Sequence, residues 1–272
     1  GIYGLVGKAA GQMGNLVWLA FLASMVAAGL TGLSYASLGS RYPKAGGAAY
    51  ITNRAFHMSW LAYGVGLVAL ASGLTSMATA TRVWSGYFLA LIGSDAPIAF
   101  AIIGFSVFLA AIVFLGIRES MWANAVCTLI ELAGLGIVIA FGMSFIGSVD
   151  YLSAVTVSNP AGEIGPALIL TGAVLTFYSF VGFEDILNVA EEVKNPQRTL
   201  PLGLILAVSI SSIIYMLVSV IAVSVIPSGD LAASKEPLVD VVRTAAPWFP
   251  SGIFSVIAMF AVANTALLNF VM

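Results

Sequence analysis

Two carboxylates lie in apolar stretches of the chain, where a charged group is costly. Glu131 stands 13 residues after Arg118 and 16 before Gly147, so its side chain reaches neither end of its apolar run. Glu184 directly follows the stretch "FYSFVGF". A carboxyl at the centre of a bilayer costs on the order of 2.5 to 3.5 kcal/mol, and such groups commonly mark a substrate pathway or a proton relay. Both are candidate proton-handling groups; for Glu131 the alternative is a structural acid that is hydrogen-bonded to the first or eighth helix.

Glycine clusters interrupt two of the apolar stretches. One is "GIYGLVGKAAG" at residues 1–11, and the other is "FYSFVGFED" at residues 177–185, where Ser179 and Gly182 precede the acids. Irregular backbone at membrane depth is tolerated only where protein buries it or water reaches it. Unwound backbone exposes N–H groups and carbonyls, which attract the carboxylate and the ammonium group of a zwitterion such as an amino acid. Glycines spaced by four, such as Gly7 and Gly11, also pack membrane helices together, but two clusters in corresponding positions favour unwinding.

The composition is that of an integral membrane protein. Of the 272 residues, 60% are hydrophobic and 8% are charged, whereas about a quarter of the residues in soluble proteins are charged. The chain has one cysteine, Cys127, and one histidine, His57, which is too few for an internal disulfide or an ordinary metal or haem centre. It has no GxSxG motif. We therefore expect neither an enzyme nor a bound cofactor, and nothing in the chain indicates nucleic-acid binding.

Apolar windows of about 20 residues predict seven membrane spans after a shorter first segment, Gly1–Gly14. The spans are Asn15–Ser40, Trp60–Ile92, Ala96–Gly116, Ser120–Gly147, Gly165–Val189, Leu200–Ile226 and Ser251 to the end. Between them, residues 41–56 have the composition of an interfacial helix, and the loop of residues 227–250 has helical spacing of its own. The chain opens on Gly rather than Met and closes within an apolar segment, so we expect a fragment of a longer protein.

The basic residues predict the orientation in the membrane. If successive loops alternate sides, six basic residues fall on one side and two on the other. The first set is Arg41, Lys44, Arg54, Arg118, Lys194 and Arg198, and the second is Lys235 and Arg243. Because cytoplasmic loops carry the excess of Lys and Arg, the N-terminus is expected in the cytoplasm and the loop of residues 227–250 outside.

Three motifs, in order along the chain, resemble those of amino acid-polyamine-organocation (APC) superfamily transporters. They are the opening "GIY", "SYASLGSRYPKAGGAAY" at residues 34–50, and "EEVKNPQRTLP" at residues 191–201. The resemblance implies an all-α membrane fold of inverted five-helix repeats with discontinuous helices 1 and 6, within about twelve helices in all. Residues 1–147 would hold the first repeat, with helix 1 incomplete, and residues 165–272 would hold helices 6–8 of the second.

The resemblance also assigns roles to individual residues. Main-chain amides at Gly1, Ile2 and Gly4 would meet a substrate carboxylate. Carbonyls in the sixth-helix break would meet an ammonium group, and Gly182 would permit that break; the matching positions are Tyr178, Ser179, Phe180 and Val181. For the aromatic residues the alternative is ordinary helix packing. Polar residues of the eighth span are candidates to face Glu131, or to bond between helices; they are Asn264, Thr265 and Asn269.

The function implied by the resemblance is secondary transport of amino acids or related amines by alternating access. Proton-coupled symport or exchange is expected, and Na⁺ is the less favoured coupling ion. Some relatives carry a lysine at the position of Glu131, so this chain departs from their pattern. The alternative is a non-transporting amino acid sensor or a channel on the same fold. The partners would be the substrate and membrane lipid, in the plasma (inner) membrane, and the substrate's identity and the oligomeric state stay open.

Overall fold

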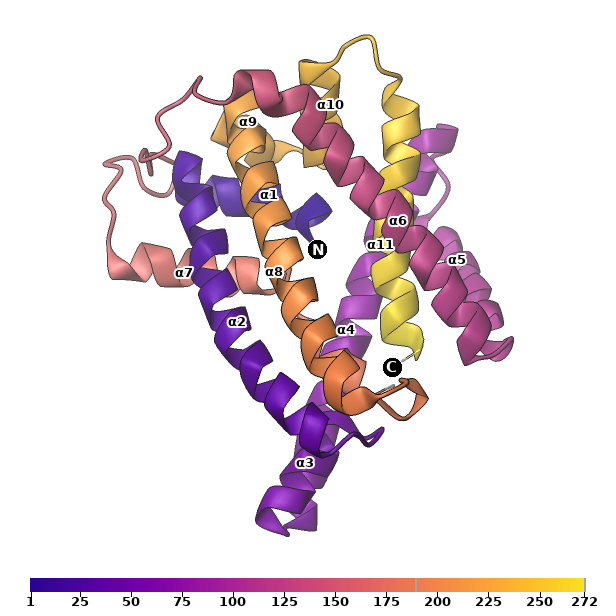
Figure 1. The fold of residues 1–272 in the computed structure, drawn as a ribbon. Helices are drawn as coiled ribbons and strands as arrows, with labels where there is room; N and C mark the ends of the chain where they lie inside the picture. The colour runs from indigo at the N-terminus through magenta and orange to yellow at the C-terminus, as the bar shows by residue number, and fades with distance from the viewer. Residues whose placement is uncertain (189, 272) are drawn as a thin grey trace. The chain divides into compact units, whose positions relative to one another are not determined.

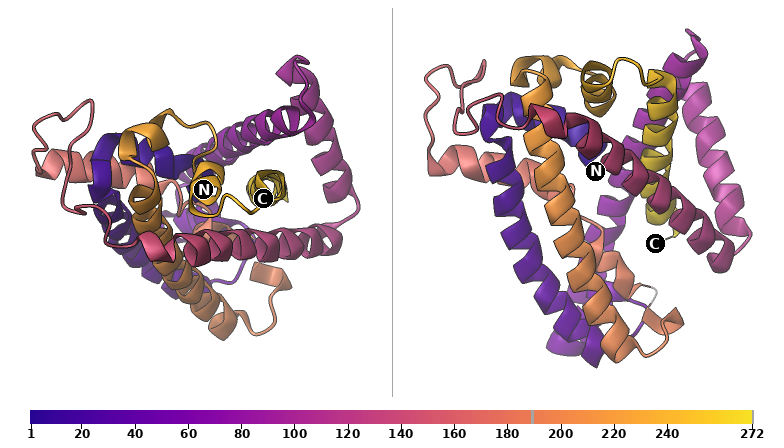
Figure 2. Two further views of the ribbon diagram at one scale, coloured as in Figure 1. Left: turned by 90° about the horizontal axis from the view of Figure 1, so that it is seen from above. Right: turned by 45° about the horizontal axis from the view of Figure 1, so that its top comes forward.

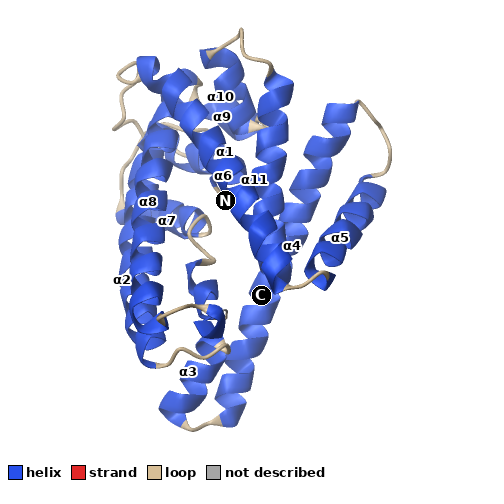
Figure 3. Ribbon diagram, turned by 45° about the vertical axis from the view of Figure 1, so that its right-hand side comes forward, coloured by secondary structure: helices blue, strands red, loops and turns tan. Residues whose placement is uncertain are grey.

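The protein is an assembly of helices in the computed structural model, which describes residues 1–188 and 190–271, without the side chains of residues 117–119. Val189, Met272 and the side chain of Arg118, which entered the predicted spans and loop charges, lie outside the described residues. Helices joined by turns make up the part of the chain that is described, and no strand occurs in it (Figure 3). The all-α fold class is confirmed.

The helices in the predicted spans Ala96–Gly116 and Gly165–Val189 are shorter than predicted, with 17 and 12 residues. Helices are observed in all of the predicted segments. They are α1 (Ile2–Met13), α2 (Val17–Arg41), α4 (Ser59–Ile92), α5 (Ile98–Phe114), α6 (Ile117–Gly142), α7 (Pro166–Phe177), α8 (Pro196–Val225) and α11 (Ser251–Val271), as Figure 1 shows. Among the described residues, five helical stretches are long and apolar enough to cross a membrane, the first being Ile2–Arg41, which joins α1 and α2 through a 3₁₀ turn. The protein is therefore a multi-pass membrane protein.

Three short helices lie between the spans, where the sequence predicts helical character. α3 (Gly47–Phe56) follows the basic loop after α2, and α9 (Ser228–Ala233) and α10 (Pro237–Ala245) lie in the loop between α8 and α11. α10 begins with Pro237 in its first turn, where the missing proline N–H costs no helical hydrogen bond.

Contacts divide the chain into two compact units, and each is described by itself. The first unit contains residues 1–17, 73–163 and 217–272, and the second contains residues 18–72 and 164–216. Each unit joins segments that are far apart in the sequence. The expected inverted repeats, residues 1–147 and 165–272, are continuous segments and do not coincide with these two units. The repeats stay a prediction.

The first unit is built around α11. α6 runs beside it (Figures 1 and 2), and α1, α5 and α10 contact it as well. Phe105 and Leu109 of α5 are buried with Ala266 and Leu267 of α11. Trp84 of α4 stacks on Phe105 with ring centroids 3.9 Å apart. This aromatic and aliphatic packing fixes α11 against its neighbours.

Unwinding of the first glycine cluster was expected, and within Ile2–Met13 that expectation is wrong. α1 is one uninterrupted helix through Gly4, Gly7 and Gly11. A Cβ atom on Gly7 would collide with the main-chain carbonyl of Leu231, and one on Gly11 would lie 2.7 Å from the Cβ of Ala232. The two glycines therefore let α9 pack directly on α1, which is the close-packing role of small residues in membrane helices.

The second unit holds α2, α3, α7, the first part of α4 and most of α8. Leu187 and Leu200 form a buried cluster there, with Tyr35 and Ile51 packed against it. Tyr35 of α2 also meets Phe183 edge to face, with centroids 5.9 Å apart. These contacts hold the segment that follows α7 against α2 and α3.

Candidate functional site

The end of α7 is tied to α2 by buried hydroxyl groups. The Ser24 hydroxyl donates to the carbonyl oxygen of Ala173 at 2.7 Å, and its Oγ lies 2.7 Å from Oγ1 of Thr176. Thr176 also bonds back to the carbonyl oxygen of Gly172 at 3.0 Å. Both hydroxyl side chains are fully buried. Serine and threonine hydroxyls compete for main-chain groups in this way, and α7 ends one residue later, at Phe177.

The chain then leaves the α-helical path, which confirms the predicted break in the sixth span. The N–H groups of Ser179 and Phe180 donate to carbonyls three residues back, as in a tight turn. Gly182 has φ of 115°, a left-handed conformation that glycine adopts without strain. In the described part of the chain, no main-chain N–H donates to the carbonyl oxygens of Ser179, Phe180 or Val181. The break therefore leaves bare acceptors within an apolar segment.

A buried hydroxyl lies in the same break. Ser179 is 8% exposed, and its Oγ has no hydrogen-bond partner among the described residues. The next residue, Phe180, is buried and packs against Tyr215 with ring centroids 5.4 Å apart, whereas Tyr178 and Val181 are each 37% exposed. A buried polar group without a partner costs about 1–3 kcal/mol, so one that persists calls for an explanation such as an absent ligand.

Glu184 bonds to the broken backbone. Its Oε2 accepts a hydrogen bond from the N–H of Gly182 at 2.9 Å, two residues back. The carboxylate thereby satisfies one donor that the loss of helix leaves open. The neighbouring Asp185 lies 3.5 Å from the side-chain amide of Asn188. The two adjacent acids thus take part in the turn that follows α7.

Glu131, in the first unit, is hydrogen-bonded to both helices that the sequence argument named. The amide Nδ2 of Asn264 on α11 donates to Oε2 of Glu131 at 3.1 Å and to Oγ1 of Thr128 at 3.0 Å. The hydroxyl of Tyr3 on α1 donates to the main-chain carbonyl of Glu131 at 3.0 Å. The hydrogen bonds expected of a structural acid at Glu131 are therefore present. A hydrogen-bonded carboxyl is also able to exchange a proton, so the relay role stays a prediction.

The three polar candidates on α11 behave differently. Asn264 reaches Glu131, but Thr265 bonds to the carbonyl of Ala261 and Asn269 to the carbonyl of Thr265, both within α11. In the part of the chain that is described, only Asn264 of the three therefore bonds to another helix.

The remaining candidates lie at the start of α1. Gly1 is its N-cap residue, without a side-chain cap, and Gly4 is exposed with its N–H on the carbonyl of Gly1 at 3.3 Å. Ile2 is buried. These three belong to the first compact unit, whereas residues 178–182 belong to the second.

Comparison with known proteins decides the family. The family model described as "Amino acid permease" matches residues 1–272, the whole chain. The chain belongs to the amino acid permease family. The resemblance of its motifs to APC superfamily transporters is thereby confirmed.

Individual permeases and transporters are similar to the chain over most of its length. The branched-chain amino acid permease BcaP of Bacillus subtilis is 26% identical over 98% of this chain and 60% of its own length. Cationic amino acid transporter 4, vacuolar, of Arabidopsis thaliana is 34% identical over 84% of this chain and 40% of its own. The methylthioribose transporter of Bacillus subtilis is 26% identical over 98% and 60%. The chain thus spans 60% or less of the length of these three relatives.

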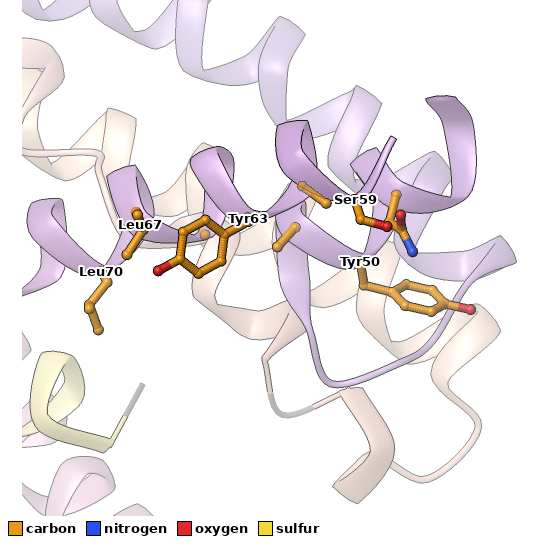
Figure 4. A pocket seen from close by; sticks show the side chains of 9 residues that line it. Tyr50, Ser59, Tyr63, Leu67 and Leu70 are labelled. Atoms are coloured by element: carbon orange, nitrogen blue, oxygen red, sulfur yellow. The ribbon is translucent and has the colours of Figure 1, made fainter. Parts of the chain in front are cut away.

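A groove on α3 and α4 is separate from the residues to which the family resemblance assigns a role in binding the substrate. It has a volume of about 550 Å³, and Tyr50, Ser59, Tyr63, Leu67 and Leu70 are among its lining residues (Figure 4). None of the lining residues belongs to the break after α7. Among the described residues no group of three or more His, Cys, Asp and Glu could hold a metal ion.

Two polar residues that form hydrogen bonds near the candidate residues, Thr128 and Ser24, were not predicted from the sequence. Thr128 lies three residues before Glu131, a spacing that places both on one helical face, and this signal could have found it. Ser24 lies in an apolar helix with no local signal, because its partner Thr176 is 152 residues away.

Proposed function

We propose that the protein carries amino acids or related amines across a membrane by alternating access, with the ammonium group of the substrate held at the helix break after α7. One observation carries this proposal, namely that the break after α7 leaves the carbonyl oxygens of residues 179–181 and the buried hydroxyl of Ser179 without hydrogen-bond donors among the described residues. An ammonium group supplies such donors, and bare carbonyls at a broken helix bind cations in transporters of this kind. The family and the names of the relatives agree with this substrate class.

The substrate carboxylate is assigned to the start of α1. The first N–H groups of a helix have no intrahelical acceptor and lie at the positive end of its dipole, so they favour an anion. The family resemblance assigns the carboxylate to the amides of Gly1, Ile2 and Gly4, and the N–H of Gly4, which donates to the carbonyl of Gly1 at 3.3 Å, would exchange that bond for the substrate. The inverted five-helix repeats would provide the two alternating states, with the N-terminus in the cytoplasm and the protein in the plasma (inner) membrane.

Transport into liposomes tests the proposal. The complete protein, as its gene encodes it, is reconstituted, and uptake of a labelled amino acid is competed by a panel of amino acids and polyamines, with and without a pH gradient. We expect saturable uptake that a subset of the panel inhibits, and accumulation against a concentration gradient. Specific binding without flux would identify a sensor instead, and flux that does not saturate would identify a channel.

Coupling to protons is assigned to Glu131, and symport and exchange are the two modes to separate. We expect Glu131→Gln to retain substrate binding but to lose accumulation driven by a pH gradient, because the amide takes up no proton. The matched control is Glu163→Gln, since Glu163 is an exposed acid in the loop before α7. Accumulation unchanged in Glu131→Gln would remove this residue from the mechanism and would favour exchange that needs no titrating group.

A further inference from the structure

Among the described residues, one side chain donates a hydrogen bond to the Glu131 carboxyl, and it comes from α11. Asn264 donates through the same Nδ2 atom to Oε2 of Glu131, at 3.1 Å, and to Oγ1 of Thr128, at 3.0 Å. The salt bridges in the described part of the chain are Lys44–Glu191 and Arg243–Asp240, so no described basic side chain pairs with Glu131. The amide of Asn264 is therefore the group that orients this carboxyl.

The other half of the same amide is unused. Oδ1 of Asn264 is buried and has no hydrogen-bond partner among the described residues. An amide whose two N–H groups bond while its buried oxygen bonds to nothing is only half satisfied. A buried acceptor of this kind costs free energy unless another state of the protein gives it a donor.

A protonated Glu131 would be such a donor. As a carboxylate, Glu131 only accepts, and the N–H side of Asn264 suits it. Once it binds a proton, it carries an O–H that must donate, and a half turn of the amide brings Oδ1 to that position. The Thr128 hydroxyl, which now donates to the carbonyl of Asn124 at 2.9 Å, can accept or donate and so fits both orientations.

The main chain at Glu131 is held independently of this amide. Tyr3 of α1 donates to the carbonyl of Glu131 and packs against Phe254 of α11, with ring centroids 6.3 Å apart. Gly134 has no room for a side chain, because a Cβ there would collide with the Tyr3 hydroxyl and with Ile257. Loss of the Asn264 amide should therefore free the carboxyl without moving the backbone that carries it.

We propose that Asn264 is the positioning residue of Glu131, with an amide that pairs with the carboxyl in both of its protonation states. This inference rests on the proposed role of Glu131 as the proton-coupling group. Among the described side chains, the Cys127 thiol lies in electrostatic range of Glu131, and the Tyr3 hydroxyl bonds to the main chain of Glu131.

The test compares Asn264→Leu with Asn269→Leu in the complete protein, reconstituted in liposomes. Asn269 lies on the same helix, but its amide bonds to the carbonyl of Thr265 within that helix. We expect Asn264→Leu to lower pH-driven accumulation by about tenfold, as the loss of a hydrogen bond to a charged group predicts. Substrate exchange at equal pH on both sides, which needs no proton, should stay within about threefold of the unaltered protein, and Asn269→Leu should change neither measurement.

A double variant separates positioning from a merely structural role. If Asn264 acts through Glu131, then Asn264→Leu adds no further loss of driven accumulation in the Glu131→Gln background, because the two effects are not additive. Additive loss, or normal accumulation in Asn264→Leu beside a loss in Glu131→Gln, would overturn the positioning role alone. Normal accumulation in Glu131→Gln would instead overturn the proposed coupling role on which this inference rests.

Discussion

At the scale of single residues, two buried serines contrast. Ser24 has its hydroxyl bonded to Ala173 and close to Thr176, whereas Ser179 has a buried hydroxyl without a partner among the described residues. A satisfied buried hydroxyl contributes to stability, and an unsatisfied one does not. Ser24 therefore stabilises the end of α7, whereas the hydroxyl of Ser179 is available to bind a ligand.

We therefore expect Ser179→Ala and Ser24→Ala to have opposite effects. Ser179→Ala should leave the melting temperature unchanged or raise it, while substrate affinity falls by about tenfold if the hydroxyl bonds to the ammonium group. Ser24→Ala should lower stability by about 1 kcal/mol, since it removes a buried bond at the end of α7. Thermal unfolding in detergent and binding titration measure both, and a destabilised Ser179→Ala with normal affinity would contradict the assignment.

At the scale of elements, the packing of α9 on α1 depends on small residues. α1 stays helical through its glycines, and Gly7 lies against the main chain of α9. Backbone cannot move aside as a flexible side chain can, so this contact tolerates no added atom. The glycine cluster is thus explained by a neighbour that lies more than 200 residues away in the sequence.

A pair of glycine substitutions on this one helix tests that account. Gly7→Ala should destabilise the protein by about 1–3 kcal/mol, because its Cβ would overlap the Leu231 carbonyl and come within 2.8 Å of Pro237. Gly4→Ala is the control, since nothing lies within 4 Å of its Cβ. Alanine at a helical position removes the entropic cost of glycine, so Gly4→Ala should be neutral or stabilising. Equal melting temperatures for the two variants would refute the packing role.

At the scale of the whole molecule, many large apolar side chains face outward. Trp60 is 70% exposed and Phe114 is 91% exposed, as lipid-facing residues are expected to be. The connecting segments carry polar clusters instead, and one of them surrounds the start of α10. There the N–H of Glu236 donates to Oγ of Ser234 at 3.0 Å, and Asp240 pairs with Arg243 at 2.9 Å.

This cluster adds a pH dependence to the stability of the molecule. Burial raises the pKa of Glu236, the nearby Asp240 raises it further, and Arg243 opposes them. Because the folded pKa exceeds the unfolded one, the folded state binds the proton more tightly. The stability that follows is fully present below the unfolded pKa, about 4.3, and is lost as the pH rises through the folded value.

We expect Glu236→Gln to remove this dependence. Its melting temperature should equal that of the unaltered protein near pH 4 and exceed it near pH 7, where Glu236 is ionised at a cost to the folded state. Thermal unfolding across this range measures the difference. A variant that is less stable than the unaltered protein at pH 7 would show that the ionised carboxylate stabilises the cluster.

The sequence by itself determined the spans, the short helices between them, the break near Gly182 and the family. It could do so because a 20-residue apolar run has to be helical in lipid, and because glycine beside acids in such a run is a local signal. These features depend on residues that are neighbours in the chain.

Only the tertiary structure decided which groups meet. Asn264 and Glu131 are 133 residues apart, and Ser24 and Thr176 are 152 apart, so no local pattern could pair them. The same holds for Gly7, where packing and unwinding predict the same glycine spacing and differ only in whether another helix lies against it. Periodicity reports which face of a helix is apolar, and the partner of that face is set by the packing of the whole chain.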